Sequence, residues 1–176
     1  MQEIRDIYDD SGQNTGRTFL KGTRLGENEF FLQVVVLLRR KDGRYLFQQR
    51  SLNDRHFPGQ WDVTGGGVIH GEDSRTAGVR EVQEELGIIL SPESLVFGGR
   101  IQQTGKNAAR YFVDMYGVCG DFAAEDCIPA PGEVNAIRMA DREEFRQAVS
   151  SNKDKAFMEL LDQTISLLER RQSTTF

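Results

Sequence analysis

The stretch from Gly66 to Ile88, GGVIHGEDSRTAGVREVQEELGI, decides the fold. It opens in a glycine run, and Gly87 near its end is the residue type that most often stops a helix. A helix over 74–86 would gather aliphatic side chains on one face and three glutamates, at 81, 84 and 85, on roughly the opposite face. The aliphatic face predicts packing against a sheet, and the acidic face predicts a position at a cleft or in solvent.

The three glutamates lie where a purely structural helix would not favour them. Glu81 repels Glu84 and Glu85, which follow it at i+3 and i+4. Glu84 and Glu85 also lie in the last turn, where the helix dipole disfavours negative charge, whereas Asp73 or Ser74 could cap the first turn. Divalent cations between the carboxylates would relieve the repulsion, and Mg²⁺ suits such a site because it binds carboxylates, water and phosphate oxygens. Since charge runs on helices are usually solvated, the surrounding spacing has to decide.

That spacing matches the Nudix box, G-x5-E-x7-R-E-U-x-E-E-x-G-U, where U is a bulky aliphatic residue. The matching residues are Gly66, Glu72, Arg80, Glu81, Val82, Glu84, Glu85, Gly87 and Ile88. The chain therefore resembles the Nudix hydrolase family, and the alignable part runs from about residue 30 to residue 145. The resemblance implies an α/β/α sandwich with a central mixed sheet.

The pattern outside the box agrees with that fold. Residues 1–28 alternate polar and apolar side chains around a turn at 9–12, which predicts a β-hairpin or an extended arm. Asp141 is expected to cap a short helix that ends at Val149. The remaining predicted elements are strands at Phe30–Leu38, Tyr45–Arg50, Trp61–Thr64, Leu95–Gln103, Arg110–Val118 and Val134–Met139, and a final amphipathic helix at Ala156–Arg170. The arm and the final helix could cover the chain's own core or serve a homodimer.

Composition predicts a single domain, because 176 residues suit one sizeable core. We divide it into a 1–28 arm, a 30–145 core and a 151–172 helix. No apolar run is long enough to span a bilayer, and the first residues lack a signal-peptide pattern. Cys119 and Cys127 have neither metal-ligand nor disulfide spacing, so we expect reduced thiols in a cytoplasmic protein. A net charge of −5 argues against a broad nucleic-acid interface, but not against a phosphorylated small molecule, because bound cations reverse the local field.

The resemblance also assigns roles to box residues. Glu81 and Glu85 are the expected metal ligands, and Glu84 would hold a further cation or orient the attacking water. In the family a carbonyl at the position of Gly65 coordinates the metal, and an arginine–glutamate pair, here Arg80 with Glu72, supports the loop. The glycine run 65–67, Gly66 included, is expected to turn the backbone and let it approach a ligand, and Gly87 to end the helix.

These roles predict a hydrolase that cleaves a diphosphate linkage in a nucleoside diphosphate derivative or a similar X-linked diphosphate. Cations, Mg²⁺ with Mn²⁺ as a substitute, would neutralise the phosphoryl oxygens and lower the pKa of a bound water. The base that accepts the water's proton is either a box glutamate or an acid from a later loop, for which Glu133 is the candidate and Glu125 and Asp126 are rivals. Candidate phosphate contacts outside the box are Arg50, Arg55, Lys106 and Arg110.

Two alternatives belong to other classes. The N-terminal layout, with Phe57-Pro58-Gly59-x-Trp61, looks like isopentenyl-diphosphate isomerase, a branch of the same superfamily. That branch carries a catalytic cysteine just after the tryptophan strand, whereas this chain has Asp62-Val63-Thr64-Gly65 there, which argues against isomerase activity. A non-catalytic ligand sensor on the same fold would be expected to lose box carboxylates, and all are retained here.

Overall fold

The computed structural model describes residues 3–54, 56–105 and 108–173. Its strands are β1 (Ile4–Tyr8), β2 (Asn14–Leu20), β3 (Phe31–Arg40), β4 (Tyr45–Arg50), β5 (Trp61–Asp62), β6 (Thr64–Gly67), β7 (Val96–Thr104), β8 (Arg110–Gly120) and β9 (Val134–Ala140). Its helices are α1 (Ser74–Leu86), α2 (Arg142–Val149) and α3 (Lys155–Ser173).

The main sheet has seven strands and is mixed. β3 runs through its centre and pairs in parallel with β8 along its whole length, whereas its other neighbours, β4 and β6, are antiparallel to it. β7 extends the sheet beyond β8, and β9 extends it beyond β4. Val34, Val35 and Val36 suit this central position because β-branched side chains pack well on a pleated surface covered on both faces.

The segment from Trp61 to Gly67 lies between β3 and β4 where these two strands diverge. β3 pairs with β4 only near Leu38 and Arg39. Beyond that point β5 pairs with β4 and β6 pairs with β3, so one short segment fills the gap with two different partners. The sheet is therefore split between β3 and β4. Glu85 of α1 lies over this split, since it contacts Gln48 of β4 and Gly65 of β6.

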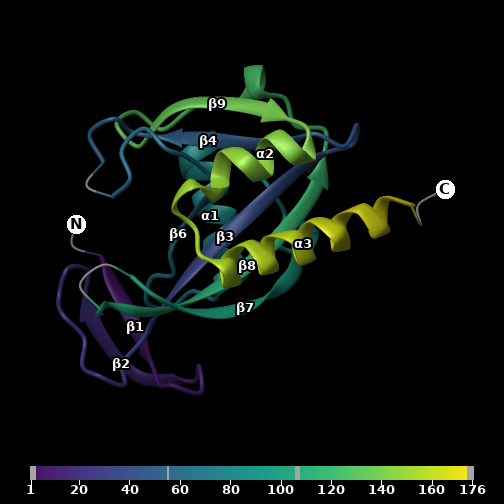
Figure 1. Cartoon of the computed structure of the whole chain (residues 1–176). Helices are drawn as coiled ribbons and strands as arrows, with labels where there is room; N and C mark the ends of the chain where they lie inside the picture. Colours follow the sequence, from purple (N-terminus) through teal and green to yellow (C-terminus); the bar gives the residue numbers. More distant parts are fainter. Residues whose placement is uncertain (1–2, 55, 106–107, 174–176) are drawn as a thin grey trace.

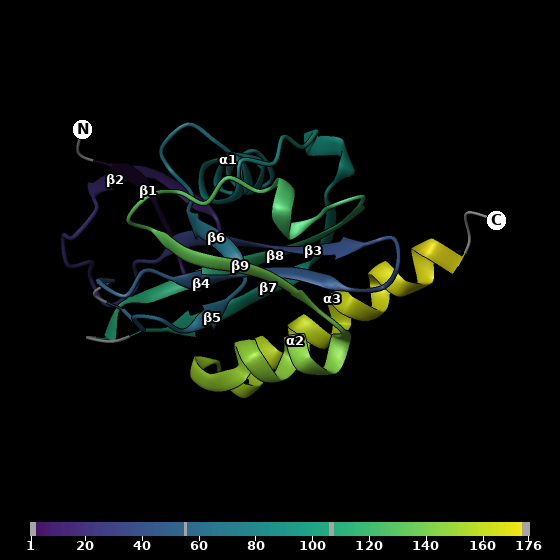
Figure 2. The same ribbon diagram turned by 90° about the horizontal axis from the view of Figure 1, so that it is seen from above.

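Helices cover both faces of the sheet, α1 on one and α2 with α3 on the other (Figure 2). The reason lies in the alternation of side chains along β3. Val34 and Val36 belong to a core that includes Val82 and Leu86 of α1. Leu37 follows Val36 and points to the opposite face of the strand, where it belongs to a second core with α2 and α3.

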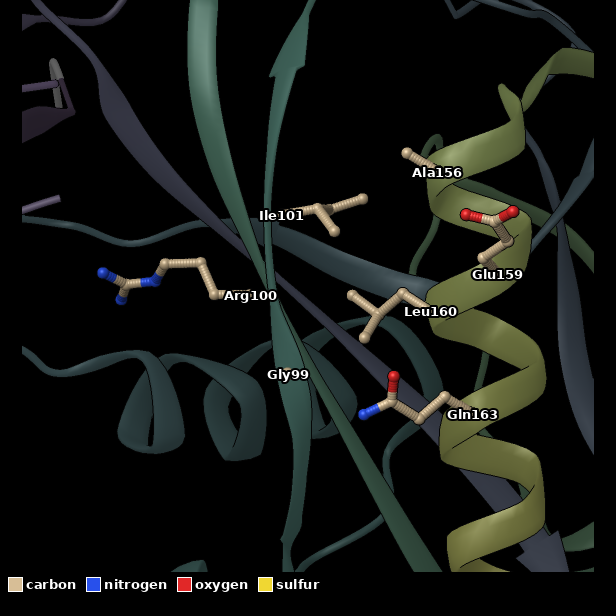
Figure 3. A pocket seen from close by; sticks show the side chains of 7 residues that line it. All are labelled: Gly99, Arg100, Ile101, Ala156, Glu159, Leu160 and Gln163. Carbon is tan, nitrogen blue, oxygen red and sulfur yellow. The ribbon is translucent and has the colours of Figure 1, made fainter. Parts of the chain in front are cut away.

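On the α3 side, a shallow pocket of about 270 Å³ lies between Gly99–Ile101 of β7 and residues 156–163 of α3. Figure 3 shows Leu160 and Ile101 pointing toward this gap, while Arg100 points to the opposite face of the sheet. There Arg100 forms an ion pair with Asp114 of β8. The pocket is remote from the box glutamates, because α1 covers the other face.

The predicted N-terminal hairpin is confirmed. β1 and β2 form a separate two-stranded sheet, which lies beside the beginning of β3 (Figure 1). A bridge between Tyr8 and Phe30 joins it to the residue that precedes β3, and Nδ1 of His70 lies 2.7 Å from Asp6. The hairpin thus stands next to the segment that leads from β6 into α1.

The sandwich, the mixed sheet and the C-terminal helix agree with the sequence prediction, but one local prediction is wrong. The glycine run was expected to be a turn, yet Thr64–Gly67 is strand β6, and the connection to α1 begins only at Val68. Glycine is needed here for close packing. A Cβ atom on Gly66 would overlap the carboxylate of Glu81.

Among the described residues, no helix combines the length and the hydropathy needed to cross a membrane. The division of the chain into arm, core and terminal helix as one domain stays a prediction.

Candidate active site

The position of α1 is set by its two ends and by its buried face. Asp73 caps the helix, since its carboxylate accepts a hydrogen bond from the N–H of Thr76 at 2.7 Å. Gly87 ends it in the left-handed region, with φ of 72°. Val82 and Leu86 are fully buried against the sheet. This fixed rotation turns Glu81 and Glu85 toward the split in the sheet and leaves Glu84 exposed.

Arg80 binds the loop and the helix together. Its guanidinium donates to Glu72 at 2.6 Å and to the carbonyl of Gly67 at 2.9 Å. It also donates to Glu81 at 2.8 Å and to Glu84 at 3.0 Å. The hydrogen bond with Glu72, followed by the charge of Glu81, raises the pKa of Arg80, so this residue stays charged. The expected Arg80–Glu72 pair is therefore present, and Arg80 offsets part of the repulsion among the carboxylates.

Glu85 is the most enclosed of the three glutamates. One oxygen accepts hydrogen bonds from the side-chain amide of Gln48 at 2.6 Å and from the N–H of Gly65 at 3.1 Å. Burial, reinforced by the charge of Glu81, raises the pKa of Glu85 to about 8. Burial also raises the pKa of Glu81, although Arg80 acts in the opposite direction. Among the described residues Glu85 has only these neutral donors, so its negative charge is not compensated.

One unpartnered oxygen lies on the amide that binds this carboxylate, and a second lies on β6. The side-chain oxygens of Gln48 and Thr64 are buried and have no hydrogen-bond partner in the described structure. Because N–H and C=O of one strand residue point to the same edge, the carbonyl of Gly65 faces the same side as the N–H that reaches Glu85. Buried polar oxygens normally have a partner. Carboxylate, carbonyl and amide oxygens are the ligands that a hard divalent cation prefers, so the residues present fit such an ion.

The carboxylates do not converge on one point by themselves. Within residues 3–54, 56–105 and 108–173, no three His, Cys, Asp or Glu side chains form a ready metal cluster. Glu81 and Glu84 are bonded to Arg80, and only Glu85 faces Gln48 and Gly65.

The loop acid Glu133 lies in a segment attached to the end of α1. The N–H of Ile128 and that of Ala130 donate to the carbonyls of Leu86 and Glu85 at 2.9 and 3.1 Å. The carbonyl of Glu133 accepts from the N–H of Ser51 at 2.8 Å, and its side chain is exposed. Its rivals Glu125 and Asp126 lie in a short 3-10 turn and are also exposed.

The candidate phosphate contacts are scattered. Arg50 is held by Asp54 at 2.6 Å and by the carbonyl of His56, and it lies 3.9 Å from Asp62. Arg110 lies over the ring of Phe30, 5.0 Å from its centre. Arg55 and Lys106 lie outside the described residues.

Sequence reasoning missed several residues next to the glutamates. Gln48 comes from β4 and binds Glu85. Asp62, in β5, is buried, and its charge acts on Glu85. Lys153, in the turn before α3, pairs with Asp62 at 2.8 Å. Gln48 and Glu85 are 37 residues apart, so no local pattern links them.

The NUDIX domain family model matches residues 30–161. This chain belongs to that family. It is a Nudix hydrolase, and 147 of its residues are 29% identical to an uncharacterized Nudix hydrolase of Listeria monocytogenes, over 83% of this chain and 84% of the relative. Over 60 residues, 33% of this chain and 43% of the relative, it is 48% identical to the nucleoside triphosphatase NudI of Salmonella agona.

The fold of this Nudix hydrolase also matches a solved structure. The crystal structure of DR0079 from Deinococcus radiodurans aligns with a TM-score of 0.70 and 20% identity, over 92% of this chain and 99% of that one. These matches show the family and the fold. They do not show the isomerase-like branch that the N-terminal layout suggested.

Proposed function

We propose that this Nudix hydrolase is a divalent-cation-dependent pyrophosphohydrolase that cleaves a diphosphate linkage in a nucleoside diphosphate derivative. The observation that carries the proposal is the uncompensated carboxylate of Glu85, enclosed beside Glu81 and the unpartnered oxygen of Gln48. The 48% identity to a nucleoside triphosphatase over the matched 60 residues supports a nucleotide substrate.

Glu81, Glu85 and Glu84, with the carbonyl of Gly65, are the residues that would hold Mg²⁺ or Mn²⁺. When bound, such cations neutralise phosphoryl oxygens and lower the pKa of a coordinated water. The chain's own residues do the rest. Arg80 and Glu72 hold the loop against α1. Residues that contact metal ligands in this way usually orient those ligands.

Gln48 orients Glu85 through its amide hydrogen bond. Glu84 is exposed and adjacent, so it can orient the attacking water or accept its proton. Glu133, on the loop bonded to the end of α1, is the second candidate for the base. Attack on phosphorus then expels a phosphate or a phosphomonoester. Arg110 and Arg50 are proposed substrate contacts, and Arg55 and Lys106 stay predictions, as does a homodimer.

A phosphate-release assay tests the proposal. Purified protein is given nucleoside triphosphates, nucleoside diphosphate sugars and dinucleoside polyphosphates, with Mg²⁺, with Mn²⁺ or with a chelator. We expect turnover that requires a divalent cation. In Glu85→Gln it should fall at least about 100-fold, because changing a residue that only supports a metal ligand commonly lowers activity 10- to 100-fold, and loss of the ligand itself should lower it more. Glu143→Gln, a glutamate in the first turn of α2, is the matched control. Absence of turnover on the whole panel, or equal activity of Glu85→Gln and wild type, would refute the proposal.

A further inference from the structure

The last two glycines of β6 face opposite sides of the sheet, as successive residues of a strand do. Gly66 meets the carboxylate of Glu81 on the α1 side. Gly67 meets the guanidinium of Arg5, a residue of β1, on the other side. A Cβ atom at either position would overlap that neighbour. The box pattern specifies the glycine at position 66 but leaves position 67 open, so contact with Arg5 explains a glycine that the box does not require.

Arg5 is held in this place by three contacts. Its side chain is 9% exposed and forms an ion pair with Glu3 at 2.5 Å. Its guanidinium carbon lies 5.4 Å from the centre of the Phe31 ring, at the start of β3. The third contact is the backbone of Gly67. A planar guanidinium can pack flat against such a neighbour, which the compact ammonium group of a lysine cannot do.

Gly67 thus lies between two arginines. Its carbonyl accepts a hydrogen bond from Arg80 at 2.9 Å, and Arg5 covers its α-carbon. Residues 65–67 have no side chains with which to pack. Pairing with β3 fixes them within the sheet, but their position perpendicular to the sheet depends on the groups that stand on its two faces. Arg5 is the group that supports Gly67 on the face opposite α1.

Arg80 carries the position of Gly67 to the box carboxylates. Besides the carbonyl of Gly67, it binds three of these carboxylates, among them that of Glu81 at 2.8 Å. A displacement of Gly67 away from α1 would either lengthen its hydrogen bond with Arg80 or draw Arg80 away from Glu81. Arg5 is therefore connected to an expected metal ligand through two intervening residues.

The two neighbours of Arg5 in β1 hold the connection between β6 and α1. The carbonyl of Ile4 accepts a hydrogen bond from the N–H of His70 at 2.8 Å. The carboxylate of Asp6 lies 2.7 Å from Nδ1 of the same histidine. Three consecutive residues of β1 thus contact the segment 67–70, directly before the loop enters α1.

We propose that Arg5 is a positioning residue of the hydrolase. By supporting Gly67 from the face opposite α1, it keeps Arg80, and through Arg80 the carboxylate of Glu81, in the geometry that binds the cation. This role rests on the proposed function and deepens it, because it makes the N-terminal hairpin a part of the cation site.

A double-mutant cycle between positions 5 and 67 tests this role. Isothermal titration measures Mn²⁺ affinity, and urea denaturation measures stability. Arg5→Ala should lower the affinity at least about threefold, because residues that support metal ligands commonly contribute 10- to 100-fold and Arg5 lies one residue further away. Gly67→Ala should lower it at least as much, since its Cβ atom overlaps the guanidinium; Gly67 is outside the left-handed region, so alanine meets no backbone strain there. Arg17→Ala, an exposed arginine of β2 paired with Glu29, is the matched control and should leave the affinity unchanged.

The double variant separates a direct contact from two unrelated effects. In Arg5→Ala combined with Gly67→Ala, the new Cβ atom occupies space that the guanidinium has left. Its Mn²⁺ affinity should therefore lie within about twofold of that of Arg5→Ala alone, whereas independent effects would multiply. If Arg5→Ala does not fold, the same cycle is measured with Arg5→Lys. That variant keeps the charge beside Glu3 but lacks the planar group, so its affinity should also fall.

Wild-type Mn²⁺ affinity in the Arg5 variant that folds, an equal loss in Arg17→Ala, or multiplying effects in the double variant would overturn this role. Lower stability with unchanged affinity would overturn it as well, because Arg5 would then only hold the hairpin in place. Failure of the proposed function has a different signature: the phosphate-release panel is negative, whereas Mn²⁺ binding and the coupling between positions 5 and 67 persist. Turnover without the coupling leaves the function standing and removes the role of Arg5, and a wild type that binds no divalent cation removes both.

Discussion

At the scale of single residues, the site consists of carboxylates held in unequal surroundings. Glu84 is exposed, Glu81 shares Arg80, and Glu85 is enclosed with neutral donors only. A cation beside Glu85 would compensate a charge that the metal-free chain leaves isolated, and metal binding would displace a proton from it. This difference predicts how stability depends on pH.

The metal-free protein should become less stable as pH rises through the neutral range. Since the pKa of Glu85 is raised to about 8 in the folded chain, folded protein holds a proton between about pH 4.5 and 8 that unfolded protein has lost. The free energy of unfolding therefore falls across this window, by at most about 5 kcal/mol. Urea denaturation with a chelator, from pH 5 to 8, measures it.

Glu85→Gln supplies the comparison for that pH series. It removes the titrating carboxyl but keeps its size, so the fall should become clearly shallower. The raised pKa of Glu81 leaves some residual slope in the same direction. A wild type whose stability is flat or rises over this range would contradict the assignment of Glu85 as an uncompensated buried acid.

At the scale of elements, β6 and α1 pack so closely that a Cβ atom at position 66 would overlap the carboxylate of Glu81 and force that side chain to move. Gly66 lies in an extended strand, so its value is the absence of a side chain facing Glu81. Burial of Val82 and Leu86 holds α1 in this close position. The cap at Asp73 fixes the start of α1 at Ser74, directly after the loop from β6.

Gly66→Ala should weaken cation binding more than it weakens the fold. The added Cβ atom would push the carboxylate of Glu81 away from Arg80, and we expect divalent affinity to fall by about 10- to 100-fold. Overpacking of this kind costs roughly 1–3 kcal/mol of stability. Isothermal titration with Mn²⁺ and urea denaturation separate the two effects. Gly26→Ala serves as control, because its Cβ atom meets only the side chain of Glu29, outside the box. Unchanged Mn²⁺ affinity in Gly66→Ala would contradict a role for the Gly66–Glu81 contact in cation binding.

Asp73→Ala should destabilise α1 from its first turn. Loss of an N-cap side chain typically costs about 1 kcal/mol, and here the N–H of Thr76 loses its acceptor. Thermal or urea unfolding measures the loss. Asp121→Ala, an exposed acid after β8, should change stability by less than about 0.5 kcal/mol. A loss of the same size in both variants would mean that the cap contributes nothing specific.

At the scale of the whole molecule, Asp114 connects four parts of the chain. It lies on β8, accepts from Ser74 at the start of α1 at 2.5 Å, and pairs with Arg100 of β7 at 2.5 and 2.8 Å. Arg100 also donates to the carbonyl of Gly12 in the hairpin turn. The box helix, the sheet and the hairpin are thus connected by one buried carboxylate.

Asp114→Asn should therefore lower the free energy of unfolding by roughly 3 kcal/mol, because it leaves the partly buried charge of Arg100 without its partner. Urea denaturation measures the loss, with Asp121→Asn as the exposed control. Destabilisation below about 1 kcal/mol would show that the carboxylate does not bear this connecting role.

Features that depend on interactions within a few residues were predicted correctly, whereas features that depend on contacts between distant segments were not. The helix over 74–86, its stop at Gly87 and the Arg80–Glu72 pair are local, and each is found where the spacing places it. The cap was expected at Asp73 or Ser74, and the structure has it at Asp73. The glycine run was misread as a turn because its glycines make close contacts with other elements: Gly65 with Val34 and Val35 of β3, and Gly66 with Glu81 of α1. Gln48 could not be predicted, since only the split between β3 and β4 brings it to Glu85.

The sequence by itself determined the family, the order of the elements and which carboxylates share a face of α1, because helical periodicity and cap chemistry act within a few residues. Only the tertiary structure decided that Glu85 is enclosed and that Gln48 and the N–H of Gly65 face it. These features depend on contacts between segments far apart in the chain. Burial and electrostatic environment are properties of such contacts, so no local pattern encodes them.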